Sequence, residues 1–176
     1  FLEKYTNYFD SSLDELEEFF GKKILELKRY ELENQSYNII EQAKKNEIGI
    51  LIPGDCFSAT THISLLLEAR KVGVEVNIIH GSSILTAVGE TGLSLYNFGK
   101  ITTIPFNNKN VKSPIEVLKN NLKLGMHTLF LLDVKDGKYM SISEGLKYLV
   151  ENKIKADTLV VGCCGLGSEK KEIKFG

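Results

Sequence analysis

The chain alternates short apolar runs with segments of helical periodicity, and this alternation constrains its fold more than any other feature. Strand-sized apolar runs fall at residues 24–28, 48–52, 74–79, 101–106, 127–134 and 158–163. Helical periodicity fills the intervals at residues 13–20, 36–45, 60–71, 82–92, 113–124 and from 142 onward. Strands that alternate with helices of about 10–15 residues imply right-handed crossovers and a largely parallel sheet. The predicted fold class is therefore α/β.

Capping signals mark the ends of several of these helices. A capping box at residues 12–15 opens the first helix, and Gly21 ends it. Ser113 is a predicted N-cap that is followed by Pro114 at the first helical position. A further capping signal at residues 141–144 opens the last predicted helix.

A polar cluster at residues 107–110 is the predicted domain boundary. It divides the chain into an N-terminal α/β domain, residues 1–106, and part of a C-terminal α/β domain, residues 107–176. The sequence begins at Phe1 without a methionine and ends just after a Gly-rich stretch. We therefore expect elements of the fold to be missing from both ends of this sequence.

Charge and hydropathy exclude several classes of protein. The 22 Lys and Arg residues nearly balance the 23 Asp and Glu residues, which leaves a net charge of -1. Such a chain has no large basic field for a phosphate backbone, so we expect no nucleic-acid partner. Its apolar runs are also far too short to span a bilayer, so we expect no membrane partner.

The three cysteines give no sign of a disulfide framework or a zinc knuckle. Cys56, Cys163 and Cys164 are odd in number and never spaced C-x-x-C. We expect reduced, buried thiols in a cytoplasmic protein.

Candidate ligand-binding residues follow the apolar runs, because open α/β sheets bind ligands at the carboxyl ends of their strands. Four such places are rich in Gly, Ser or Asp: residues 54–58, 80–84, 132–133 and 162–167. Asp55 could accept hydrogen bonds from a ribose or an amine, or it could merely cap the following helix. Ser82 and Ser83 are likewise more typical of N-caps than of ligand contacts.

Other kinds of chemistry lack their motifs. The glycines at 162, 165 and 167 do not fit G-x-G-x-x-G, and no P-loop or G-x-S-x-G elbow occurs. No spacing of the histidines at 62, 80 and 127 predicts a metal site, so we expect no metal. The residues alone therefore predict an α/β protein with a cleft for a small molecule and identify no catalytic residue.

Several runs of residues resemble the diphthine synthase family, the methyltransferases of diphthamide biosynthesis. The most specific are the A-T-T-H run that ends at His62 and H-T-L-F-L-L-D at residues 127–133. The resemblance continues through residues 52–62, 79–84, 87–89, 91–93, 95–100, 125–133 and 139–140. It therefore covers nearly the whole chain. Residues 1–6 resemble the family's second strand, which implies that the first strand and the final stretch are missing from this sequence.

The resemblance implies a tetrapyrrole-methylase-like enzyme with two α/β domains, S-adenosyl-L-methionine in the cleft between them, and a homodimer. Carried over by position, the cofactor contacts are Asp55, Ser58, Ser83, Ile84, Leu132 and Leu166. Two departures stand out. Cys56 replaces the family's usual proline, and Gly165 lacks a basic side chain that the family has there.

The reaction implied by the resemblance is methyl transfer to the amino group of a 3-amino-3-carboxypropyl chain on a modified histidine of elongation factor 2, which forms diphthine. The sulfonium donor is already activated, so the protein has mainly to orient the amine and exclude water. Two alternatives stay open. One is a tetrapyrrole methyltransferase that acts on a corrin precursor, and the other is a non-catalytic metabolite-sensing domain.

Overall fold

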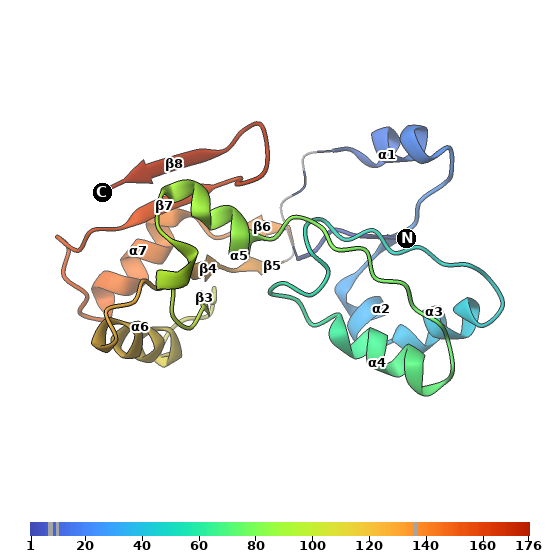
Figure 1. Ribbon diagram of the computed structural model, residues 1–176, viewed down its shortest axis with the longest axis horizontal. Helices are drawn as coiled ribbons and strands as arrows, with labels where there is room; N and C mark the ends of the chain where they lie inside the picture. Colours follow the sequence, from blue (N-terminus) through green and yellow to red (C-terminus); the bar gives the residue numbers. More distant parts are fainter. Residues whose placement is uncertain (7–8, 10, 136) are drawn as a thin grey trace. The chain divides into compact units, whose positions relative to one another are not determined.

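The computed structural model describes residues 1–6, 9, 11–135 and 137–176. They form two compact units, Phe1–Leu85 and Thr86–Gly176 (Figure 1). Each unit combines helices with short strands, so the α/β prediction is confirmed. None of the helices in this part of the chain has the length and apolar character needed to cross a membrane.

The first unit is mainly helical around one small parallel sheet. Its elements are β1 (Leu2–Glu3), α1 (Leu13–Phe20), β2 (Glu26–Leu27), α2 (Arg29–Glu33), α3 (Ser36–Ala43), α4 (Ile63–Lys71) and the start of α5 (Ile84–Ala87). Strand β1 pairs in parallel with β2 and makes a single parallel bridge to Leu51. Buried Leu27, Leu32 and Ile39 form the core that holds α2 and α3 against the sheet.

The second unit contains three of the two-stranded sheets. Its elements are the 3-10 helices η1 (Val88–Thr91) and η2 (Leu95–Asn97), then β3 (Thr102–Ile104), α6 (Ser113–Lys123), β4 (Phe130–Leu132), β5 (Val134–Lys135), β6 (Lys138–Tyr139), α7 (Ile142–Glu151), β7 (Val161–Cys164) and β8 (Glu172–Phe175). β3 and β4 are parallel, whereas β5 with β6 and β7 with β8 are antiparallel.

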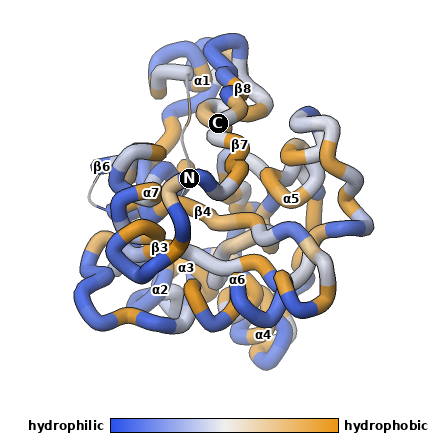
Figure 2. The backbone as a smooth tube through the Cα atoms, turned by 90° about the vertical axis from the view of Figure 1, so that its left-hand side faces the viewer, coloured by the Kyte–Doolittle hydropathy of each residue, from blue (hydrophilic) through white to orange (hydrophobic). Residues whose placement is uncertain are grey.

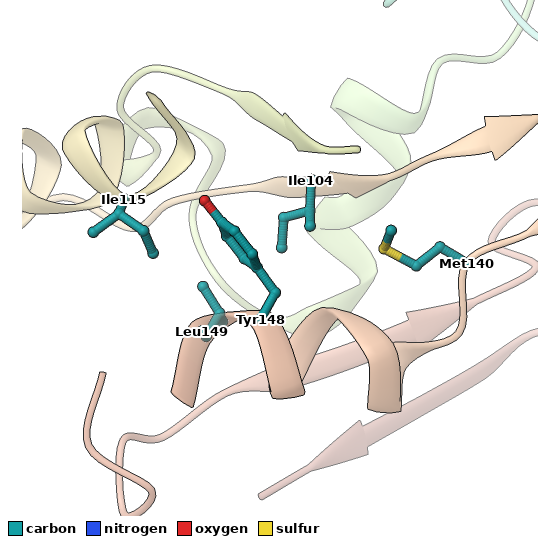
Figure 3. Close-up of a cluster of buried hydrophobic side chains, with 5 residues drawn as sticks. All are labelled: Ile104, Ile115, Met140, Tyr148 and Leu149. Carbon is teal, nitrogen blue, oxygen red and sulfur yellow. The ribbon is translucent and has the colours of Figure 1, made fainter. Parts of the chain in front are cut away.

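The core of the second unit lies between α6, α7 and the β3–β4 pair (Figure 3). Five side chains are buried there: Ile104, Ile115, Met140, Tyr148 and Leu149. Strand β4, whose sequence Phe-Leu-Leu is hydrophobic in colour in Figure 2, supplies further packing surface. The Tyr148 hydroxyl donates a hydrogen bond to the Val111 carbonyl at 2.7 Å, so the only polar atom of this side chain is satisfied.

Local signals predicted the helices well. The capping boxes at Ser12 and Ser141 are both formed, and Gly21 ends α1 in the left-handed conformation. Ser113 is an exception, because it is the first residue of α6, and Lys112 precedes the helix without a side-chain cap. Helix α2 was not predicted.

The predicted strand at residues 74–79 is wrong. These residues form no strand, and Ile79 leaves 89% of its surface exposed. The predicted strand at residues 48–52 is reduced to the bridge at Leu51. A run becomes a strand only where another segment pairs with its N–H and C=O groups, and no described segment pairs along the length of either run.

The boundary between the compact units differs from the predicted domain boundary. Strand β3 pairs with β4, which ties residues 102–104 to the second unit rather than the first. Residues 107–110 therefore lie inside the second unit. The division into domains 1–106 and 107–176 stays a prediction.

Candidate functional site

The candidate site in the first unit is the segment 54–62, which we call the Asp55 loop. Gly54 begins it with a φ of 88°, a left-handed conformation that glycine adopts without strain. Asp55 Oδ1 then accepts hydrogen bonds from the Phe57 amide at 2.9 Å and the Ser58 hydroxyl at 3.0 Å. The structure thus joins two of the predicted cofactor residues, Asp55 and Ser58, directly. The Asp55 carboxylate folds its own loop and does not cap α4, whose N-cap is His62.

His80 comes to the Asp55 loop from 25 residues further along the chain. Its Nδ1 lies 2.8 Å from Asp55 Oδ2, and because a carboxylate only accepts, Nδ1–H is the donor. This hydrogen bond, followed by that of the Phe57 amide, lowers the pKa of Asp55 from 3.8 to about 2. Asp55 is therefore an anion at neutral pH.

Gly81 allows the two segments to approach at the backbone. A Cβ at this position would lie only 2.2 Å from the Gly54 carbonyl oxygen, so any other residue would force the segments apart. The contact therefore brings together two segments, the one that begins at residue 80 after the predicted strand at 74–79 and the one that begins at residue 54 after the predicted strand at 48–52. Sequence analysis expected ligand-binding residues at both places but could not predict that they meet.

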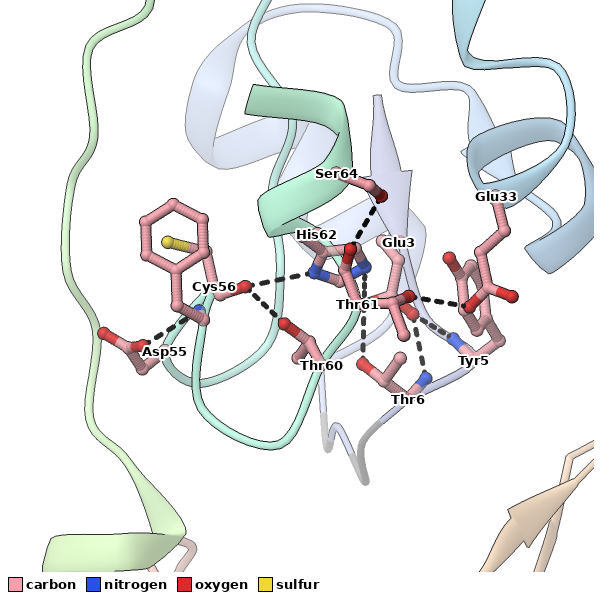
Figure 4. Close-up of polar contacts among 11 residues, drawn as sticks. Glu3, Tyr5, Thr6, Glu33, Asp55, Cys56, Thr60, Thr61, His62 and Ser64 are labelled. Atoms are coloured by element: carbon pink, nitrogen blue, oxygen red, sulfur yellow. Dashed lines mark hydrogen bonds and ion pairs between the residues drawn. The ribbon is translucent and has the colours of Figure 1, made fainter. Parts of the chain in front are cut away.

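The Cys56 carbonyl closes the Asp55 loop (Figure 4). It accepts the Thr60 hydroxyl at 2.6 Å and lies 3.2 Å from His62 Nδ1. Between these residues Ala59 is held at a φ of 59°, which is strained for a residue with a side chain. Such strain persists only where the surrounding contacts over-determine the backbone.

Ser83 and Ile84, the next two predicted cofactor residues, stand at the start of α5, and both are half-buried. The Ser83 hydroxyl accepts a hydrogen bond from the Leu85 amide at 3.1 Å, as a serine that precedes a helix does. This contact supports the capping interpretation of Ser83. Its assignment as a cofactor contact stays a prediction.

Leu132 and Leu166 belong to the second unit and lie on different elements of it. Leu132 ends β4, and its side chain packs on the core and on α7, where a Cβ at Gly145 would lie 2.8 Å from Leu132 Cδ2. Leu132 as a whole is half-buried, and its assignment as a cofactor contact stays a prediction. Leu166 is half-buried in the turn between β7 and β8, flanked by Gly165 and Gly167, which both have positive φ.

Asp55, Cys56 and His80 offer ligand atoms that all lie within 4.8 Å of one another. Spacing along the chain could not detect this group, because it unites residues 25 positions apart. The three side chains could hold a metal ion of intermediate softness. Both Asp55 oxygens already accept hydrogen bonds from the protein, so we assign no metal to this group.

Cys56 and Cys163 are poorly suited to act as nucleophiles. Burial raises the pKa of both Cys56 and Cys163, which keeps these thiols protonated at neutral pH. All three cysteines are free, as predicted. The expectation of buried thiols is wrong, because Cys56 and Cys163 are only half-buried and Cys164, which ends β7 beside an open turn, is exposed.

Comparison with known proteins identifies clear relatives. The sequence model of the family described as "Tetrapyrrole (Corrin/Porphyrin) Methylases" matches residues 3–176. A diphthine synthase of Methanocaldococcus jannaschii is 42% identical over 94% of this chain and 70% of its own length. A diphthine synthase of Archaeoglobus fulgidus is 41% identical over 99% of this chain and 69% of its own length.

Solved structures show the same relationship. A crystal structure of diphthine synthase superposes with a TM-score of 0.92 at 40% identity, covering 99% of this chain and 69% of that one. A putative diphthine synthase from Entamoeba histolytica gives a TM-score of 0.86 at 33% identity, covering 99% and 72%.

Proposed function

Since the chain belongs to the diphthine synthases of the tetrapyrrole methylase family, and is thus a methyltransferase of diphthamide biosynthesis, we propose that it methylates elongation factor 2. The acceptor is the amino group of a 3-amino-3-carboxypropyl chain on a modified histidine, and S-adenosylmethionine is the donor. The observation that carries the proposal is 42% identity to a diphthine synthase over 94% of the chain.

The Asp55 loop has the chemistry that the cofactor requires. A carboxylate offers about four lone pairs, and three are used by Phe57, Ser58 and His80. One acceptor site on Oδ2 therefore remains for a hydroxyl or amino group of the cofactor. Gly81 lets its segment approach Gly54 closely, which brings His80 to the Asp55 carboxylate. We assign cofactor contacts to Asp55, Ser58, Ser83, Ile84, Leu132 and Leu166.

The residues of this chain act by binding and orientation rather than by proton transfer. When bound, S-adenosylmethionine supplies an activated methyl group on a sulfonium. Asp55 stays anionic because its pKa is about 2, so it serves as a fixed acceptor and not as a general base at neutral pH. Its hydrogen bonds are made before the cofactor binds, so little ordering is needed on binding. We assign no catalytic acid, base or nucleophile.

The partners follow from the same proposal. Elongation factor 2 is the protein substrate, and the family resemblance implies a homodimer. We place the enzyme in the cytoplasm, where translation factors act and where three free thiols stay reduced.

The direct test is methyl transfer from labelled S-adenosylmethionine to elongation factor 2 that carries the aminocarboxypropyl histidine. Unmodified elongation factor 2 and a corrin precursor are the control acceptors. We expect label only on the modified factor, and an Asp55→Ala variant should bind the cofactor about tenfold less tightly by calorimetry. Label on the corrin precursor, or cofactor binding without transfer to any acceptor, would overturn the proposal.

A further inference from the structure

We propose that His62 is a positioning residue, which holds the Asp55 loop in its cofactor-binding shape through the Cys56 carbonyl. This inference deepens the proposed function and rests on it. His62 ends the A-T-T-H run, yet neither the hydrogen bonds of Asp55 nor the proposed mechanism uses its side chain. It is nevertheless one of the few polar residues that the first unit buries, with 5% of its surface exposed.

The tautomer of His62 follows from its neighbours. Nδ1 lies 3.2 Å from the Cys56 carbonyl oxygen. A carbonyl only accepts, so Nδ1 carries the proton and donates it. This hydrogen bond connects His62, the N-cap of α4, to Cys56, which follows Asp55 and lies six positions earlier in the chain. His62 therefore fixes the loop from its far end.

The other ring nitrogen faces a buried carboxylate without a hydrogen bond to it. Nε2 makes no hydrogen bond to any described residue and lies 3.9 Å from Glu3 Oε2. Glu3 is fully buried, and its carboxylate accepts the Tyr5 amide, the Thr6 amide and the Thr6 hydroxyl at 2.6–2.8 Å. The ring is thus wedged between the carboxylate at the end of β1 and the Cys56 carbonyl (Figure 4).

Burying the His62 ring with an unpaired nitrogen costs stability. Its role in shaping the Asp55 loop accounts for that cost. A buried nitrogen without a hydrogen bond is unfavourable, and an apolar residue would avoid it. The Cys56 carbonyl accepts from both Nδ1 and the Thr60 hydroxyl, so these hydrogen bonds span Ala59, whose φ is 59°. On this proposal they restrain the loop in the shape in which Asp55 accepts the Ser58 hydroxyl. An apolar side chain at residue 62 could fill the same space but could not hold the carbonyl.

Two conservative variants distinguish the contribution of Nδ1 from that of Nε2. In His62→Asn the amide nitrogen takes the place of Nδ1 and keeps the hydrogen bond to the Cys56 carbonyl. In His62→Gln the amide group reaches the place of Nε2 and loses that hydrogen bond. Leu66→Ala is the matched control, because Leu66 is buried one helical turn further along α4 and its hydrogen bond to His62 is made by the backbone amide, which the substitution keeps.

The experiment measures binding of S-adenosylhomocysteine by calorimetry, the KM for the cofactor and the unfolding midpoint for the full chain. We expect His62→Gln to bind about tenfold more weakly, with a higher KM and unchanged kcat, and His62→Asn to bind within about threefold of the unmodified protein. Leu66→Ala should lower the midpoint without changing affinity.

Two results would overturn the proposal: equal affinity of the two His62 variants, or affinity that falls in step with the unfolding midpoint across all three variants. A failure of the proposed function is distinguishable from both, because the unmodified protein would then transfer no methyl group to the modified elongation factor 2, whatever the affinities of the His62 variants.

Discussion

The two units bury polar side chains in different ways. In the second unit, buried Asn121 uses its whole amide group: it accepts the Lys100 amide and donates to the Lys100 carbonyl and the Thr128 hydroxyl at 2.9–3.0 Å. In the first unit, His62 Nε2 and the Tyr5 hydroxyl are buried without a hydrogen bond to any described residue. Native proteins rarely leave such groups unsatisfied.

This difference indicates that the second unit is optimised for stable packing, whereas the first unit sacrifices some stability around one loop. The second unit satisfies Asn121 and surrounds Tyr148 with apolar side chains, as a segment selected for packing would. The first unit concentrates its unsatisfied atoms and its buried carboxylate around one loop, which also holds Ala59 at positive φ. Positive φ alone does not separate the units, because Asn110 and Lys153 of the second unit have it too. Local violations of packing rules of this kind cluster at functional sites.

The largest effect should come from Glu3. Glu3→Ala removes a fully buried carboxylate and leaves two backbone amides and the Thr6 hydroxyl without their acceptor. We expect a loss of about 4 kcal/mol in the free energy of unfolding, measured by urea denaturation. A loss below about 1 kcal/mol would show that the buried charge of the first unit does not support its structure.

A smaller effect is expected in the core of the second unit. Tyr148→Phe keeps the ring but removes the hydroxyl that donates to the Val111 carbonyl. The free energy of unfolding should fall by about 1.5 kcal/mol, because that carbonyl loses its partner. The same denaturation series checks this value. If Tyr148→Phe cost more than Glu3→Ala, the contrast between the two units would be reversed.

The smallest effect concerns pH and is confined to the Asp55 loop. The pKa of Asp55 is lowered from 3.8 to about 2, so its hydrogen bonds add stability above pH ~4 that is lost as the pH falls towards about 2. His80→Ala should raise the pKa of Asp55 towards 3.8, because it removes the side-chain hydrogen bond that is the leading cause of the shift. Carboxyl NMR titration measures this, with Asp157 as the internal control. An unchanged pKa would remove His80 from the site.

Sequence reasoning succeeded where the signal is local. The capping boxes at Ser12 and Ser141 involve residues three apart, and both form as predicted. The prediction of a strand at residues 74–79 was wrong. Strand pairing depends on a distant segment, and the apolar pattern does not reveal whether such a segment is present.

The same limit applies to the candidate site. Asp55 and Ser58 were chosen together and do meet, since they are three residues apart. His80 approaches Asp55 from 25 positions away, and Glu3 approaches His62 from 59 positions away. No rule based on spacing along the chain could predict either contact. A signal was nevertheless present for His80, because both it and Asp55 follow apolar runs.

The most direct test of the account is an NMR titration of the isotope-labelled chain with S-adenosylhomocysteine. The central claim is that the Asp55 loop of the first unit holds the cofactor. It predicts saturable shifts of the Phe57 and Ser58 amide resonances, with little change at the amides of α1. Binding that leaves the resonances of residues 54–62 unmoved would contradict it.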